Sequence, residues 1–121
     1  MIKLLAVDDE PGICNIIKKT FGPTGFTIFT ANSGKEALSI VKKEKPLIVF
    51  LDIMMPGMSG LEALREIKKI DKGIKVIMVT VMDDAKTREE ARRGGADEFV
   101  TKPFLPGYLE DLVRKMIQEA F

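Results

Sequence analysis

The sequence predicts an α/β fold with a single, doubly wound sheet of five parallel strands in the order 2-1-3-4-5 and helices on both faces. Short apolar runs alternate with segments of helical periodicity along the chain, as in sheets built from crossover units. The runs at 3–7, 47–51 and 75–79 are almost wholly apolar, whereas those at 26–30 and 97–101 carry threonines or charges. Strands buried on both faces lie inside such a sheet, so the more polar pair belongs at its edges.

The first strand, 3–7, leads into a helix that begins at Glu10-Pro11, because proline suits the first helical position. Ile13, Ile16 and Ile17 have the spacing of a stripe that faces the core. The helix ends in the glycine-rich turn that follows Phe21, and the second strand, 26–30, comes next.

Two later helices begin with the same signal. Ser33 with Glu36, and Ser59 with Glu62, have the spacing of capping boxes, in which each side chain satisfies a free amide of the other residue. The third strand, 47–51, lies between these helices and runs directly into Asp52. A charge therefore follows the most apolar strand of the chain.

The second half repeats the alternation. The strand at 75–79 leads to a helix between acidic residues at 83–84 and glycine at 94–95, whose only apolar residues are alanines, so it should be the least anchored helix. The strand at 97–101 follows. A last helix carries an apolar stripe at Leu109, Leu112, Val113, Met116 and Ile117.

Composition indicates one domain, residues 1–121, in the cytoplasm. The chain is 45% hydrophobic and 31% charged, with a net charge of +1, so it has no overall attraction to nucleic acid or to a membrane. Its lone Cys14, expected to be core filling, cannot form an internal disulfide, and no apolar run has the length of a membrane span. The absence of histidine excludes Ser-His-Asp catalysis and most zinc sites.

Polar side chains follow four of the predicted strands. Asp8, Asp9 and Glu10 follow the first, Asp52 the third, Thr80 the fourth and Lys102 the fifth. In an open parallel sheet the carboxyl ends of the strands meet at one edge, and ligands bind where the strand order reverses, here between the first and third strands. Asp8, Asp9 and Asp52 should therefore meet.

Three close carboxylates repel one another by about 4 kcal/mol per pair at an effective dielectric near 20, so they need cations. Lys102 supplies one, and an oxygen-only group suits a hard ion such as Mg²⁺, with Mn²⁺ as the alternative. Asp52 stands alone on the central strand and is the candidate nucleophile, because aspartate can form an aspartyl-phosphate. Lys102 and Thr80 would contact the transferring phosphoryl oxygens.

These residues resemble the receiver domain of two-component response regulators, a flavodoxin-like fold, over the whole chain. The resemblance rests on Val7-Asp8-Asp9-Glu10, Asp52-Ile-Met-Met-Pro56-Gly-Met-Ser-Gly60, Thr80, and Gly95-Ala-Asp-Glu-Phe99-Val-Thr-Lys102-Pro103-Phe104.

The resemblance implies that Asp52 is the phosphoacceptor, that Asp8 or Asp9 and the Met54 backbone carbonyl hold Mg²⁺, and that Thr80 and Lys102 bind the phosphoryl group. It implies Thr80 and Phe99 as the switch pair and a cis bond between Lys102 and Pro103. The phosphoryl donor would be a sensor histidine kinase or a phosphotransfer protein. A downstream protein or output domain would bind the face of the fourth helix, fifth strand and last helix, with no direct contact to nucleic acid or membrane.

Several positions depart from the family pattern. Val81 is branched where a small residue is common and would narrow access to Asp52. Met54 and Met82 cannot orient a hydrolytic water, so we expect a long-lived phosphoryl group and at most weak self-dephosphorylation. Tyr108 and Leu112 stand where one subfamily has the charged residues of its dimer. Leu105, Tyr108 and Phe99 could instead form an apolar docking patch beside Arg88, Arg92 and Arg93.

Plainer interpretations stay open for single residues. Each acid could be a helix cap or a solvated loop residue, Thr80 a strand-end hydroxyl, Lys102 a surface lysine and Phe99 ordinary core. Two other functions also remain, a Mg²⁺-dependent aspartyl-phosphate phosphohydrolase and a degenerate receiver that acts as an unregulated interaction module. The hydrolase usually has a second aspartate two residues after the nucleophile, where this chain has Met54.

Overall fold

The computed structural model describes residues 1–120 and confirms the predicted fold class. Parallel pairing gives one five-stranded sheet in the order β2-β1-β3-β4-β5. The strands are β1 (Lys3–Val7), β2 (Thr27–Ala31), β3 (Ile48–Leu51), β4 (Lys75–Thr80) and β5 (Glu98–Thr101). The helices are α1 (Pro11–Phe21), the 3-10 turn η1 (Gly22–Thr24), α2 (Gly34–Glu44), α3 (Gly60–Ile70), α4 (Ala85–Gly94) and α5 (Pro106–Ala120).

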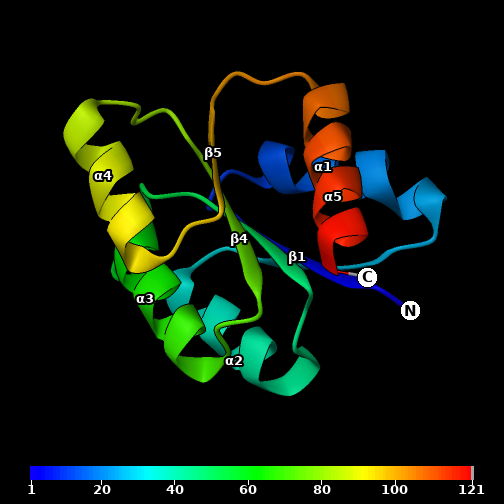
Figure 1. Cartoon of the computed structure of the whole chain (residues 1–121), viewed down its shortest axis with the longest axis horizontal. Helices are drawn as coiled ribbons and strands as arrows, with labels where there is room; N and C mark the ends of the chain where they lie inside the picture. Colours follow the sequence, from blue (N-terminus) through cyan, green and yellow to red (C-terminus); the bar gives the residue numbers. More distant parts are fainter. Residues whose placement is uncertain (121) are drawn as a thin grey trace.

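The sheet is the middle layer of three (Figure 1). α1 and α5 cover one face, and α2, α3 and α4 cover the other. Each face has its own core cluster: Phe21, Phe50 and Leu109 belong to the α1 and α5 side, whereas Leu51, Leu64 and Met78 belong to the opposite side. All of β3 is buried, as its apolar sequence predicts, and the edge strands β2 and β5 are only half-buried along most of their length.

The two predicted capping boxes differ. Ser59 accepts a hydrogen bond from the amide of Glu62, and the Glu62 carboxylate accepts one from the amide of Ser59, so this box is complete. Ser33 accepts from the amide of Glu36, but the Glu36 carboxylate accepts instead from the amide of Asn32, one residue too early. The prediction is therefore correct for α3 and half correct for α2.

The inward stripe of α1 also differs from the prediction. Ile17 is buried and Ile13 half-buried, but Ile16 faces outward and Cys14 takes its place in the core. Position 16 lies on the opposite side of the helix from position 14, so only one of the two can face the sheet. The prediction that Cys14 fills the core is confirmed.

α4 is held by few buried groups, as its alanine-only composition predicts. Its buried residues are Thr87 and Ala91. The Asp84 carboxylate caps it by accepting from the amide and hydroxyl of Thr87, and it ends at Gly95, whose φ of 103° is left-handed. Within residues 1–120, no helix combines the length and the apolar character that crossing a bilayer requires.

Candidate functional site

Backbone hydrogen bonds join the ends of all five strands at one edge of the sheet. The amide of Asp8 donates to Ala31 at the end of β2, and the amide of Asp52 donates to Val7 at the end of β1. The amide of Lys102 donates to the carbonyl of Thr80 at the end of β4. The sheet ladder thus continues one residue past the strands, and each of these side chains starts from a fixed position.

The Lys102 ammonium is the centre of the group. Its nitrogen lies 2.8 Å from an Asp8 oxygen, 3.0 Å from a Glu10 oxygen and 3.2 Å from an Asp52 oxygen. Only 8% of the Lys102 side chain and 4% of the Asp52 side chain are exposed. The prediction that Lys102, Asp8 and Asp52 converge is confirmed, and a surface position for Lys102 is excluded.

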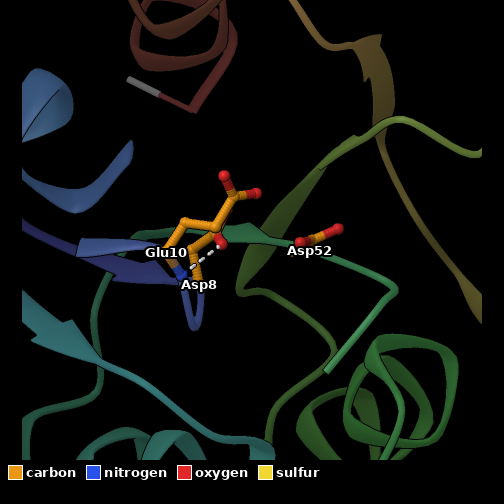
Figure 2. A group of neighbouring side chains, drawn as sticks. All are labelled: Asp8, Glu10 and Asp52. Carbon is orange, nitrogen blue, oxygen red and sulfur yellow. Dashed lines mark hydrogen bonds between the residues drawn. The ribbon is translucent and has the colours of Figure 1, made fainter. Parts of the chain in front are cut away.

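Three carboxylates form the acidic wall of this site. One oxygen each from Asp8, Glu10 and Asp52 lies within 4.8 Å of the other two (Figure 2). Asp8 and Glu10 extend from the end of β1, and Asp52 extends from the end of β3. One lysine leaves this group with an excess of negative charge, and carboxylate oxygens without sulfur or imidazole are the donors that Mg²⁺ accepts. The side chains therefore fit a divalent hard cation.

The protonation of the site follows from burial and these contacts. Burial raises the pKa of the Asp8 carboxyl above its ordinary value, and the bonds from Lys102 and from the Glu10 amide offset this only in part. Burial alone would lower the pKa of the Lys102 ammonium, but its bonds to Asp8 and Glu10 and the charge of Asp52 raise it above its ordinary value. Lys102 is therefore a permanent cation at neutral pH.

Asp9 and Glu10 are placed differently from the expectation. Asp9 is exposed and lies outside the group of three carboxylates, so its proposed contact with the metal stays a prediction. Glu10, which the sequence did not single out, takes its place beside Asp8 and Asp52. The cause is local, since Asp8 accepts a hydrogen bond of 3.0 Å from the amide of Glu10, an Asx-turn that folds Glu10 over Asp8. The sequence signal that could have predicted this turn is an aspartate, Asp8, placed two residues before Glu10.

The loops that follow Asp52 and Thr80 carry the remaining predicted residues. The other Asp52 oxygen accepts from the amide of Met54, whose side chain faces outward. Thr80 is fully buried, and its hydroxyl oxygen accepts from the amide of Met82. Among residues 1–120, no hydrogen bond joins the Thr80 hydroxyl to the carboxylates. Thr80 is thus close to Lys102 through the backbone only.

The loop after Asp52 also brings α3 against the site. The amide of Gly60, the first residue of α3, donates to Ile53, and a Cβ at position 60 would lie 1.9 Å from the Asp52 carbonyl oxygen. Only glycine allows the helix to begin so close to the backbone of Asp52.

Phe99 is half-buried on β5, and the Arg88 guanidinium of α4 lies 4.5 Å from the centre of its ring. Arg88 also donates to the Thr101 hydroxyl and to the Asp83 carbonyl. Leu105 and Tyr108 are exposed beside Phe99 and line one groove with it.

Leu112 is buried, so it cannot serve a surface dimer contact. Lys102 and Pro103 are joined by the expected cis bond.

Comparisons with known proteins agree with this geometry. The family model of the response regulator receiver domain matches residues 4–114. The chain is 38% identical over 115 residues to sporulation initiation phosphotransferase F of Bacillus subtilis, covering 95% of this chain and 93% of that protein. It is 39% identical to the probable transcriptional regulator ycf27 of Guillardia theta, covering 96% of this chain and 45% of that protein. It thus spans about half the length of the ycf27 relatives that it matches.

The chain is also similar to a solved structure. The response regulator protein TrrA of Thermotoga maritima, in complex with Mg(2+)-BeF, has 38% sequence identity and a TM-score of 0.86, with 96% of this chain and 99% of that chain covered.

Proposed function

Because this chain belongs to the family of response regulator receiver domains, we propose that it is a phosphorylation-controlled switch of a two-component system, with Asp52 as its phosphoacceptor. The family works by aspartyl phosphorylation. We assign the whole chain, residues 1–121, to one such domain.

The observation that supports this proposal is the contact of Lys102 with both Asp8 and Asp52. A buried ammonium 3.2 Å from an Asp52 oxygen can follow that oxygen when it becomes part of an acyl phosphate. In the proposed reaction the Asp52 oxygen attacks phosphorus, the bond between phosphorus and the donor's histidine nitrogen breaks, and that nitrogen keeps the electron pair. Lys102 then binds a phosphoryl oxygen, and no strong base is needed.

Asp8 and Asp52, with Asp9 and the Met54 carbonyl as the predicted additional ligands, would hold Mg²⁺ or Mn²⁺ beside the nucleophile. Bound there, the ion would offset charge on the phosphoryl oxygens. The Thr80 hydroxyl now accepts a bond from the amide of Met82 and makes no bond to the carboxylates, and its O–H would donate to a phosphoryl oxygen only in the phosphorylated state. This difference between states is what a switch requires.

Phe99 would respond to movement of Thr80, because Thr80 of β4 pairs with Thr101 and Met78 pairs with Phe99, which makes Phe99 a diagonal neighbour of Thr80 across the two strands. Its ring is held by Arg88 of α4, the helix with few buried residues. We therefore propose that the face of α4, β5 and α5 binds the downstream protein or output domain, with exposed Leu105 and Tyr108 as apolar contacts. The donor would be a sensor histidine kinase or a phosphotransfer protein.

We also propose that self-dephosphorylation is weak. Met54 follows Asp52 by two residues and Met82 follows Thr80 by two residues, and a thioether is too weak an acceptor to orient an attacking water. The exposed Val81 side chain adds bulk beside them.

Intact mass measurement tests the function. The protein is incubated with acetyl phosphate and Mg²⁺, and a mass gain of one phosphoryl group is expected for the wild type and for Asp111→Asn, an exposed control on α5. Asp52→Asn should show no gain. Repeated consumption of acetyl phosphate without mass gain would support a phosphohydrolase, and no reaction at all would support an unregulated interaction module.

A further inference from the structure

Three carboxylates surround the Lys102 ammonium. An ammonium has three N–H donors, and the Lys102 nitrogen has three carboxylate neighbours, Asp8, Glu10 and Asp52, within 3.2 Å. Lys102 donates hydrogen bonds to Glu10 and Asp52 and forms an ion pair with Asp8, so one of these contacts must give way before a phosphoryl oxygen can reach the ammonium.

The three contacts are not equally easy to break. Asp8 is buried, and its second oxygen is held by the amide of Glu10. Asp52 is buried and is the group that would carry the phosphoryl group. The Glu10 side chain is 64% exposed, so its carboxylate can leave Lys102 and rotate into the solvent at little cost in free energy. Glu10 is the contact that yields.

We propose that Glu10 is a positioning residue that competes with the phosphoryl group for Lys102. This inference rests on the function proposed above and adds a regulator of the same site. While Glu10 is bound, its carboxylate occupies the place where a phosphoryl oxygen would meet the ammonium, and its charge repels an anionic donor. Phosphorylation displaces Glu10, which directly precedes Pro11, and so frees the start of α1 on the surface beside the site.

The side chain of Glu10 can be changed without loss of a helix cap. Glu10 is the N-cap residue of α1, but its side chain makes no capping hydrogen bond. Glu10→Gln removes the charge and keeps the size. Glu10→Asp keeps the charge but is one methylene shorter, so it withdraws the carboxylate from Lys102. Glu66→Gln, on α3 and paired with Lys69, is the matched control.

The first readout is the rate of phosphorylation by acetyl phosphate at saturating Mg²⁺. We expect Glu10→Gln and Glu10→Asp to react about two- to fivefold faster than the wild type, the size of effect that an exposed ion pair can give, and Glu66→Gln to match the wild type. A wild-type rate in Glu10→Gln would overturn the proposal. A wild-type rate in Glu10→Asp would overturn it also, because charge alone would then explain the effect.

A Mg²⁺ titration separates this role from metal binding. The Mg²⁺ concentration for half-maximal phosphorylation should be unchanged in Glu10→Gln, and a tenfold increase would make Glu10 a metal ligand and overturn the proposal. The second readout needs no phosphorylation. By NMR, the Lys102 ammonium protons should exchange with water faster in Glu10→Gln than in Glu66→Gln. If the wild type takes no phosphoryl group while this difference is seen, the proposed function fails and the Glu10 contact stands; equal exchange would refute the contact.

Discussion

Replacing Gly60 by alanine should distort the phosphoacceptor's own backbone. A Cβ built at Gly60 lies 1.9 Å from the carbonyl oxygen of Asp52 and 2.6 Å from the Cα of Ile53, and real Cβ atoms essentially never approach other atoms within 3.0 Å. Both obstacles are backbone atoms, so no side chain can rotate away. α3 or the loop after β3 must move by roughly 1 Å, as overpacked cores do.

The cost can be estimated from the contacts involved. Overpacking costs about 1–3 kcal/mol, and the shift also weakens the hydrogen bond from the Gly60 amide to Ile53 and the adjacent Ser59 cap, worth about 1 kcal/mol each. Alanine lowers the conformational entropy of the unfolded chain, which offsets about 0.4–1 kcal/mol of this loss of stability. We expect a net loss of about 2–4 kcal/mol in the free energy of unfolding, which a domain of ordinary stability survives.

Urea unfolding measures this loss, and Gly12→Ala is the matched control. Gly12 also lies in the first turn of a helix, but a Cβ there meets nothing within 4 Å, so alanine should stabilise the protein slightly. Gly60→Ala that remained folded should also be phosphorylated more slowly, because Asp52 would be displaced. A stability equal to that of Gly12→Ala would refute the close approach of α3 to Asp52.

Four other substitutions have defined outcomes. Burial raises the pKa of Asp8, so the folded state binds this proton more tightly than the unfolded state, and the free energy of unfolding falls as pH rises through that pKa. In the absence of Mg²⁺, Asp8→Asn should therefore have a higher urea midpoint than the wild type at pH 7. This difference in midpoint should shrink toward pH 3. Met82→Glu should accelerate loss of the phosphoryl group, which intact mass measurements at successive times would record. A rate of loss equal to that of the wild type would contradict the role given to position 82. Ser59→Ala should lower the free energy of unfolding by about 1 kcal/mol, and Ser33→Ala, from the half-formed box, by less, both measured in urea.

Most of the fold could be predicted because strong local signals agree with the sheet that they form. The buried β3 and the more polar β2 and β5 fix the strand order, and the strand order places Asp8, Asp52 and Lys102 at one edge. The site was predictable to that extent from topology alone, since parallel strands end at a common edge whatever their side chains do.

Details that depend on side-chain direction were not predictable in the same way. Glu36 accepts from Asn32 rather than from Ser33, a choice between two neighbouring amides. Asp9 and Glu10 are both acidic and adjacent, and only the turn at Asp8 decides which one reaches Lys102. The prediction that Ile16 faces inward was wrong, because the helix buries Cys14 as expected and position 16 lies on the opposite side from position 14.

The ammonium at the centre of the site meets partners that lie 50 and 92 positions away along the chain. A chain still emerging from the ribosome has made its acids long before its lysine leaves the exit tunnel. Such a nascent molecule presents the acids without their cation, and it should be unable to take up a signal until Lys102 has emerged and folded against them. Competence to receive a signal therefore requires that the polypeptide has been made and folded at least as far as Lys102.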